Sequence, residues 1–463
     1  MRRTTKLVLT GLVGFATAGI IDGRRSSAWA QGYGLYEQGA CAMGRAGAGV
    51  AAPCDDGSSM FFNPAGLALS SGTVGSASAT SIAPRGQFTN TSTHLTSPLS
   101  SSTYFSPTAY FATPASRRIT TGVGLFAPYG LGVDWPTTSE GRFISYQSSV
   151  KSLYVQPTVA FRLNDHLSIG GGVDVTHTVV ELRRRVDLST QNITGTPLTF
   201  RTIGVPPGTD FADVSLTGST NGIGGHVGVI AAINDRVSIG ARYLSRQNLS
   251  FDNLSVAPTP VATGLSLPAS LPGLPAGTPL DQIVAGSFAA GQALGAQTGT
   301  MRLPLPDQVV VGIAVQPLSG LKILADYQYT HWKLLSQITI VNQYAPVTTY
   351  VESFGDTNGV RVGADYALGR AAVRAGFDMH DAASPDQSVT PLLPEATRQE
   401  ITAGATVPIA ARTRIDFAYM YVHQSDRDGR TTDGGLATPT VALNNGTYHY
   451  YANLFGVSVV FRF

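Results

Sequence analysis

Residues 32–66 decide the fold, and they read GYGLYEQ (32–38), GRA (44–46), CDD (54–56) and FFNPAG (61–66) in that order. Glycine and alanine recur too densely for an amphipathic helix, and Asn63-Pro64 is a dipeptide typical of chain reversals. The stretch nevertheless carries four aromatic side chains that would be costly to leave in water. They are Tyr33, Tyr36, Phe61 and Phe62. A compact, irregular segment of this kind requires an enclosure, and we expect a plug inside a β-barrel.

The composition favours a membrane barrel over soluble domains. Only 13% of the 463 residues are charged, against about 25% in ordinary globular proteins, and 52 residues are glycine. Beyond the N-terminus, no run reaches the roughly 18–20 apolar residues of a spanning helix. A transmembrane barrel has this composition because its strands alternate lipid-facing and lumen-facing side chains.

Residues 1–30 are predicted to be an export signal peptide. The first six residues include three basic ones, residues 7–21 form an apolar core, and Ala28-Trp29-Ala30 is an A-x-A cleavage site. Removing this segment leaves 26 Lys and Arg against 28 Asp and Glu, a formal charge of −2. Such a balance gives no support for a nucleic-acid partner.

From Gly72 onward the chain repeats segments with a period of two residues. At 151–162, for example, the odd positions are mostly apolar and the even positions mostly polar. Fourteen such segments are predicted, an even number, as a closed single-chain bacterial barrel requires. They lie near 72–83, 105–113, 119–133, 143–162, 167–186, 217–232, 237–250, 308–317, 321–332, 358–368, 371–379, 398–408, 412–423 and 448–463. We therefore expect an all-β fold: a 14-stranded antiparallel transmembrane β-barrel over 72–463, with an N-terminal plug (hatch) at 31–71.

The connections predict which membrane this barrel spans. Short turns, such as 164–166 and 318–320, alternate with long polar or proline-rich connections. This asymmetry is typical of the periplasmic turns and extracellular loops of barrels in the bacterial outer membrane. The connection at 251–306 is unusually apolar and has helix-compatible spacing over 279–294. Two interpretations stay open for it: a landing platform, meaning a surface on which hydrophobic ligands first bind, or a helix packed on the barrel rim.

The two cysteines, Cys41 and Cys54, both fall in the opening stretch. An exported protein meets an oxidising compartment, so a disulfide that ties the plug is one expectation and two unpaired buried thiols are the alternative. No metal or cofactor site is predicted, because no further ligands cluster nearby and the eight histidines show no metal spacing. The chain has no G-x-S-x-G elbow, so an enzyme is not expected.

The order G-x-x-L-x-E-Q, A-x-G-R-A, D-D and F-F-N-P-A-G resembles the start of the FadL/TodX family of outer-membrane transporters for long-chain fatty acids and other hydrophobic compounds. The last strand ends on Phe463, an aromatic terminus typical of proteins handed to the barrel-assembly machinery. The resemblance implies passive uptake. Ligand is captured at extracellular loops, enters a plugged apolar pocket, and leaves sideways at a kinked third strand.

By this resemblance the kinked strand corresponds to residues 124–132. Pro128 removes a ladder donor, and Gly130 and Gly132, on either side of Leu131, tolerate irregular backbone angles. We expect this strand to break its pairing, with an ordinary bulge at Gly130 as the alternative.

The resemblance also implies roles for residues outside the kinked strand. Asn63 is expected to face the kink, and Pro64 of the same motif is expected to take part in ligand binding or gating. Gly32 and Tyr33 are expected to enter the ligand pocket. Arg184 matches the family's cation for a fatty-acid carboxylate. The family's second cation has no clear match here, which leaves room for neutral hydrocarbons or aromatics.

Other partners and functions remain as expectations. Arg183 and Arg185 flank the matched arginine, and a basic rim that contacts lipopolysaccharide phosphates is the alternative for them. The protein is expected to be a monomer in contact with outer-membrane lipid. A non-specific porin is the main rival function, and a structural adhesin is the third.

Overall fold

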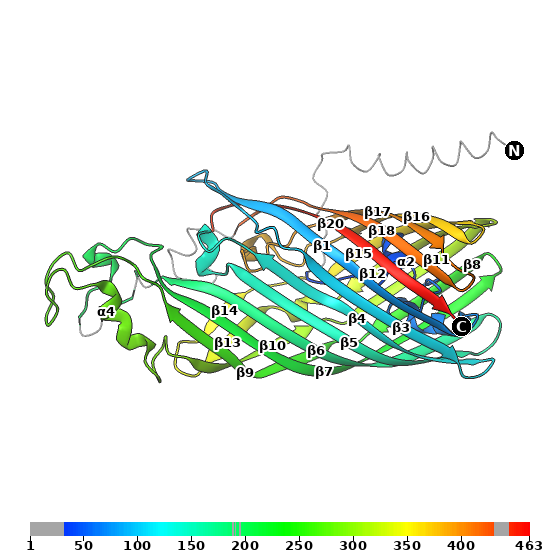
Figure 1. Cartoon of the computed structure of the whole chain (residues 1–463), viewed down its shortest axis with the longest axis horizontal. Helices are drawn as coiled ribbons and strands as arrows, with labels where there is room; N and C mark the ends of the chain where they lie inside the picture. The colour runs from blue at the N-terminus through cyan, green and yellow to red at the C-terminus, as the bar shows by residue number, and fades with distance from the viewer. Residues whose placement is uncertain (1–31, 188, 190, 194–195, 430–443) are drawn as a thin grey trace.

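The computed structural model describes residues 32–187, 189, 191–193, 196–429 and 444–463, so the predicted signal peptide lies outside the described residues. Within these residues, fourteen antiparallel strands close into a barrel, because β20 pairs with both β18 and β1 (Figure 1). The barrel strands are β1 Val74–Asn90, β3 Tyr104–Pro114, β4 Ile119–Asp134, β5 Gln147–Arg162, β6 Leu167–Asp187, β7 Asp210–Asn234, β8 Val237–Leu244, β11 Gln308–Leu318, β12 Leu321–Thr330, β15 Thr357–Leu368, β16 Ala371–His380, β17 Arg398–Pro408, β18 Thr413–Gln424 and β20 Gly446–Arg462. The predicted fold class is confirmed.

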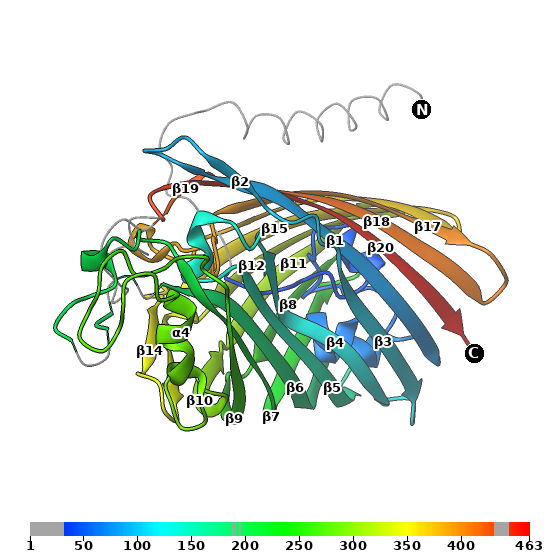
Figure 2. The ribbon, with the colours of Figure 1, turned by 60° about the vertical axis from the view of Figure 1, so that its left-hand side comes forward.

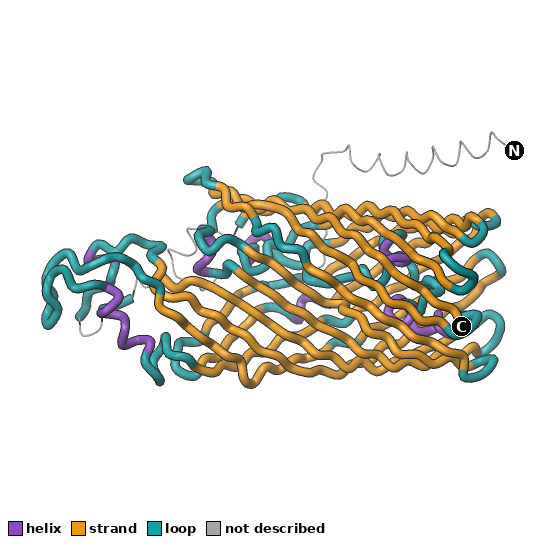
Figure 3. Tube along the Cα trace, viewed as in Figure 1, coloured by secondary structure: helices purple, strands orange, loops and turns teal. Residues whose placement is uncertain are grey.

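Six further strands extend the sheet at the end where the long connections gather, on the left in Figures 1 and 3. They are β2 Thr96–Pro98, β9 Gln247–Pro260, β10 Gln297–Leu305, β13 Gln337–Asn342, β14 Thr348–Val351 and β19 Arg427–Asp428. Four of them form a continuous extension, because β9 pairs with β7 and β10, β10 pairs with β13, and β13 pairs with β14. The short turns lie at the opposite end of the barrel.

Several strands are longer than the alternation of the sequence predicts, whereas β5, β8 and β12 are shorter than their predicted segments. β7 begins at Asp210 rather than near 217, and strand pairing continues through β9 and β10 into the predicted 251–306 connection. Because pairing partners lie side by side, these segments stay extended beyond the length that a bilayer requires. The predicted helix over 279–294 is correspondingly short: α4 Leu280–Val284 followed by the 3₁₀ turn η4 Ala285–Phe288.

The barrel wall is apolar outside and polar inside. Large apolar side chains stand exposed on the outer face, among them Val155, Val175, Ile223, Val227, Val311, Val362 and Phe417. Polar and charged side chains at the alternate positions are buried in the interior, among them Thr176, His226, Arg242, Gln308, Asp326, Gln328 and Arg361. This arrangement is the reverse of a soluble protein and suits a wall surrounded by hydrocarbon. No helix in the described part of the chain is long and apolar enough to cross a membrane.

The N-terminal segment 32–71, which we call the plug, lies within the barrel (Figure 2). It forms α2 Ala40–Met43, α3 Ser59–Phe62 and the 3₁₀ helix η1 Pro64–Leu69. Apart from Leu35, Ala52, Pro53 and Asp55, every plug residue from Tyr33 to Leu67 is buried. Enclosure by the strands therefore compensates for the plug's weak local structure.

Wall glycines let the plug backbone lie directly against the strands. At Gly363 and Gly376, an added Cβ would lie 2.6 and 2.5 Å from the backbone of Arg45. An added Cβ would come closer than 3.0 Å to a plug atom at seven further wall glycines, Gly122, Gly130, Gly170, Gly228, Gly240, Gly312 and Gly404. Eight different strands thus hold the plug by contacts that a larger residue would block.

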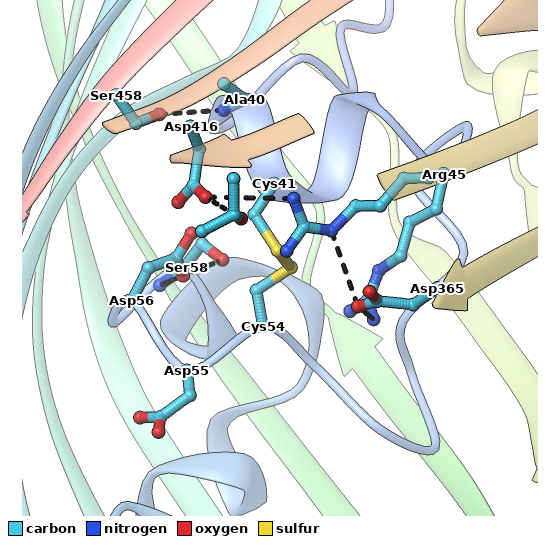
Figure 4. The surroundings of a disulfide bond; sticks show 12 residues. Ala40, Cys41, Arg45, Cys54, Asp55, Asp56, Ser58, Asp365, Asp416 and Ser458 are labelled. Atoms are coloured by element: carbon cyan, nitrogen blue, oxygen red, sulfur yellow. Dashed lines mark hydrogen bonds and ion pairs between the residues drawn. A yellow bond between two sulfur atoms is a disulfide. The ribbon is translucent and has the colours of Figure 1, made fainter. Parts of the chain in front are cut away.

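A disulfide between Cys41 and Cys54 ties α2 to the turn before α3, with the two Cα atoms 6.3 Å apart (Figure 4). Beside it, the Ala40 N–H donates to Ser458 Oγ at 2.8 Å, and the Arg45 guanidinium lies 3.8 Å from an Asp365 carboxylate oxygen. The bond and these contacts attach the middle of the plug to the wall.

Candidate functional site

The wall is incompletely paired between β3 and β4. The two strands pair from Ala109↔Leu125 to Pro114↔Thr120, and β3 residues 104–108 have no partner on β4. Those β3 residues stay paired with β1, while β4 stays paired with β5 across a bulge between Phe126 and Tyr129. The wall therefore has a break in its hydrogen bonding beside residues 126–134.

The first residues of the plug supply the pairing that β4 lacks. We call residues 32–38 the plug arm. Its Leu35 N–H donates to Pro128 O at 2.9 Å, and the Gly130 N–H donates to Tyr33 O at 3.0 Å. Unpaired backbone groups at membrane depth cost several kcal/mol each, so the arm stabilises the broken edge of the wall.

The side chain of Gln38 holds the arm to the same strand at two points. Its Nε2 donates to Ala127 O at 2.8 Å, and its Oε1 accepts from the Ala127 N–H at 3.1 Å. A Cβ added at Gly130 would lie 2.7 Å from Leu35 Cδ1, so this glycine leaves the space that the arm occupies.

The outer end of the break is closed by Asp134, whose Oδ2 accepts from Tyr104 Oη at 2.9 Å and from Ser102 Oγ at 2.8 Å. A Cβ at Gly132 would lie 2.5 Å from the Tyr104 ring. Gly132 therefore permits this closure, which confines the break to the stretch covered by the plug arm.

The beginning of the arm is held by the connection between β16 and β17. Glu395 Oε1 accepts from the Gly32 N–H at 2.9 Å, and Arg398 Nη2 donates to Gly32 O at 3.3 Å. Burial raises the pKa of Glu395, although three backbone N–H donors, including that of Gly32, act to lower it. The next residue, Tyr33, packs edge-on against Trp332 with ring centroids 4.7 Å apart.

Three cavities adjoin one another between the loop end of the barrel and the break in the wall. The wall cavity, about 530 Å³, lies at the break and includes Leu35, Glu37, Gly130, Leu131 and Gly132 in its lining. The inner cavity, about 70 Å³, lies behind Tyr33. The loop groove, about 470 Å³, lies among the long connections.

Shared lining residues show that the cavities are neighbours. The loop groove and the inner cavity share Leu182, Leu216, Ile340 and Tyr350. The inner and wall cavities share Tyr33, Leu131, Val150 and Leu393. All eight shared residues are aliphatic or aromatic and uncharged, so the series is continuous and largely apolar at its two junctions.

The charges along this series differ from one end to the other. Arg184 lines the loop groove and lies within 4 Å of no carboxylate in the described part of the chain. Its neighbour Arg185 instead pairs with Asp213 at 3.3 Å, and Arg183 pairs with Glu181 at 3.2 Å. A free cation therefore stands at the outer end of the series.

The wall cavity contains a group of carboxyl side chains. Glu37, Glu395 and Glu400 line it together with Arg398. Burial raises the pKa of Glu37 from 4.5 to about 7, and the charge of Glu400 is the next largest cause. The end of the series at the wall cavity is therefore acidic.

Most residues predicted from the sequence gather at this site. Gly130, Leu131 and Gly132 line the wall cavity, Tyr33 lies between two cavities, and Gly32 is anchored beside them. Arg184 lies in the loop groove, at the opposite end of the series.

The structure corrects the expectation that Asn63 faces the kinked strand. Asn63 Nδ2 donates to Val229 O at 3.0 Å and to Ala241 O at 3.3 Å, on β7 and β8, and its Oδ1 accepts from the Ala65 N–H. Asn63 is the N-cap of η1, and a carboxamide in this place satisfies the backbone both of the helix and of the wall.

The sequence assigned no role to several residues that make the site. Leu35, Glu37 and Gln38 belong to the opening motif, whereas Glu395 and Arg398, at the end of the β16–β17 connection and the start of β17, follow more than three hundred residues later. The available signal was polarity: Glu37 and Gln38 are adjacent polar residues in a segment that the glycine content predicts to be enclosed.

A closed antiparallel barrel with an apolar outer face and long loops at one end defines a β-barrel of the bacterial outer membrane. Residues 25–463 match the family described as outer membrane protein transport protein (OMPP1/FadL/TodX), and the chain belongs to this family. It is a transport protein of the outer membrane and not an enzyme.

Individual relatives are distant but extend over most of the chain. The chain is 24% identical to a 47 kDa outer membrane protein of Pasteurella multocida, with all of both chains covered. It is 22% identical to the long-chain fatty acid transport protein of Escherichia coli strain K12, with 95% of this chain and 96% of that protein covered.

Solved structures share the fold. A FadL homologue of Pseudomonas aeruginosa superposes with a TM-score of 0.77 at 17% identity, covering 94% of this chain and all of the other. The toluene transporter TodX of Pseudomonas putida superposes with a TM-score of 0.64 at 16% identity, covering 93% and 99%.

Proposed function

We propose that this protein takes up long-chain fatty acids or related hydrophobic compounds by diffusion across the outer membrane. The observation that carries the proposal is the series of three adjoining cavities, which leads from the loop groove to the break between β3 and β4. An apolar series of this kind offers a hydrophobic molecule a favourable path that a water-filled pore does not. Relatives named as long-chain fatty acid and toluene transporters support the class of ligand.

Capture takes place in the loop groove. The groove offers apolar side chains such as Ile283, Val284 and Leu294 from the 251–306 connection, together with Arg184. An apolar surface beside one unpaired cation suits the initial binding of an amphipathic molecule. This favours the landing-platform interpretation of the connection.

Exit takes place sideways through the wall at the break between β3 and β4. The outward-facing residues Phe105 and Leu153 line the same cavity as Tyr33 and Glu37, so the cavity extends from the interior to the outer face. A ligand that leaves here enters hydrocarbon and avoids water. The plug arm has to leave β4 for this step, because its backbone now occupies the edge of the break.

The arm moves while the rest of the plug stays in place. The arm is held by hydrogen bonds to β4, to Glu395 and Arg398, and from Tyr36 Oη to Gln308 on β11. The middle of the plug is held by close contact with glycines of eight strands and by the disulfide. We therefore assign residues 31–71 as a plug with a releasable arm, residues 72–463 as the barrel, and residues 1–30 as a cleaved signal. The exposed terminal Phe463 serves as the signal for barrel assembly.

Uptake by a variant with a filled break tests this proposal. Gly130→Val places methyl groups where Leu35 lies, whereas Gly225→Val, on the outer face of β7 with its nearest neighbour 3.9 Å away, is a matched control. We expect vesicles or cells with Gly130→Val to take up a radiolabelled long-chain acid and its alcohol several-fold more slowly, and Gly225→Val to behave as wild type. Unchanged uptake by Gly130→Val would exclude exit at this break.

Conductance distinguishes the proposal from a non-specific porin. A barrel whose interior is occupied by the plug is expected to carry little steady ion current in a planar bilayer. A large, stable conductance would favour the porin instead, and ligand binding without uptake would favour an adhesin.

A further inference from the structure

The free cation at the outer end of the series of cavities has no counterpart in the inner cavity, within the part of the chain that the structure describes. Arg184 stands in the loop groove, but none of the described residues that line the inner cavity is Lys, Arg or His. The charged side chains that line the inner cavity are Glu181 and Glu352. A carboxylate that moved inward from Arg184 would lose its counter-charge without gaining another.

The wall cavity is more acidic still. Glu37 comes from the plug arm, Glu395 from the connection before β17, and Glu400 from β17 itself. One half-buried cation, Arg398, lies among these three carboxyl groups and donates to Gly32 O at 3.3 Å. The net charge of these four groups is negative when all three carboxyl groups are ionised and zero when two of them are protonated.

Glu395 and Glu37 differ in the number of hydrogen bonds that their carboxyl oxygens accept within the protein. Glu395 accepts from the backbone N–H groups of Gly32, Ala383 and Ser384, at 2.9, 3.0 and 2.9 Å. Glu37 Oε2 accepts from the neighbouring Tyr36 N–H at 3.0 Å. Glu37 thus presents a polar oxygen to a cavity whose lining also includes apolar side chains such as Leu35 and Leu454.

We infer that the preferred ligand is an uncharged hydrophobic molecule that carries a hydroxyl group, and that Glu37 and Glu400 discriminate against carboxylates. The inference rests on the proposed uptake function and narrows its substrate class. A hydroxyl group can donate to a carboxylate or accept from a carboxylic acid, so it is compatible with Glu37 in either protonation state. An ionised fatty acid would instead bring a further negative charge into a buried acidic site, which is unfavourable at low dielectric.

The second cation in the lining of the wall cavity lies beyond the carboxyl groups. Lys151 pairs across from Gly130 on β5 and is exposed on the outer face, as are Leu153 and Val155 further along that strand. A carboxylate would reach Lys151 only after passing the acidic group. Lys151 therefore does not neutralise the barrier that this group presents to a carboxylate.

Three ligands that differ only in the head group test the inference: dodecanol, dodecane and dodecanoate. Their affinities are measured by isothermal titration calorimetry on the purified, detergent-solubilised protein at about pH 8, where dodecanoate is ionised. We expect dodecanol to bind roughly tenfold or more tightly than dodecanoate, and at least as tightly as dodecane. The same measurement on Glu37→Gln/Glu400→Gln is expected to reduce the ratio of the dodecanol and dodecanoate affinities by about tenfold.

The ratio of two affinities in one sample does not depend on the fraction of correctly folded protein. Asp252→Asn removes an exposed carboxylate of β9 remote from the wall cavity, and it is expected to leave the ratio unchanged. Tighter binding of dodecanoate than of dodecanol to wild type, or an unchanged ratio in the double variant, would overturn the inference while leaving uptake intact. Binding of none of the three ligands would overturn the proposed function and the inference together.

Discussion

Replacement of Gln38 by alanine tests whether the plug arm is held to β4 by the contacts described above. Gln38→Ala removes the two hydrogen bonds between this side chain and the backbone of Ala127, at 2.8 and 3.1 Å, and a third from Nε2 to Leu35 O at 3.2 Å. It leaves the remaining arm–β4 pairing, at Leu35 and Gly130, in place.

The expected magnitude follows from the two bonds to Ala127. A hydrogen bond contributes a net ~0.5–1.5 kcal/mol, and a buried backbone group left without a partner costs more, so docking of the arm should weaken by about 2–3 kcal/mol. This difference corresponds to a roughly 30–150-fold increase in the population of the released arm. The barrel itself should be unaffected, because Gln38 makes no bond that holds two strands together.

Hydrogen exchange measures this population. The amides of Leu35 and Gly130 donate across the contact between arm and strand, so their exchange should accelerate by about the same factor, whereas amides within paired strands such as β6 and β7 should not change. Gln337→Ala is a matched control, since the exposed Gln337 bonds only Thr339 Oγ1, at 3.2 Å, on the same strand. Unchanged exchange at Leu35 and Gly130 in Gln38→Ala would refute the assignment of Gln38 as the residue that holds the arm.

Three further predictions follow from the same contacts. Leu35→Cys/Gly130→Cys should form a disulfide that fixes the arm to β4, since a Cβ at Gly130 contacts the Leu35 side chain. Uptake should be lost on oxidation and return on reduction, and Leu35→Cys alone is the control. Uptake by the oxidised double variant would contradict release of the arm. Cys41→Ala/Cys54→Ala removes the disulfide between residues 13 apart in sequence and should destabilise the plug by ~3 kcal/mol. Trypsin should then cleave faster after the buried Arg45. A cleavage rate equal to that of wild type would show that the wall contacts suffice to hold the plug. Docking of the arm should weaken as pH rises. Burial, and then the charge of Glu400, raises the pKa of Glu37 from 4.5 to about 7, although Arg398 opposes the shift. Because the docked arm binds the proton more tightly than the released arm, docking is most stable below about pH 4.5 and loses stability as pH rises through 7. Exchange at Gly130, corrected for its intrinsic pH dependence, should therefore be faster above pH 7 than near pH 5, and Glu37→Gln should abolish the difference; a pH dependence that survives this substitution would assign it to another group.

The sequence by itself determined the barrel and the nature of its opening segment. Alternation of apolar and polar residues is a local property, because neighbouring side chains of a strand point to opposite faces, and it placed all fourteen membrane strands. The density of glycine likewise marked residues 32–66 as a segment that needs an enclosure. In the structure this segment packs against glycines of the barrel wall.

Only the tertiary structure decided which strand each part of the plug contacts. Asn63 was expected at β4 and bonds to β7 and β8, while Leu35 and Gln38 pair with the broken strand. The acidic wall cavity likewise joins Glu37 to Glu400, residues far apart in the chain. No local pattern encodes such contacts, because they depend on where the closed wall leaves unpaired backbone and space for the plug, and both are set by the pairing of all the strands together.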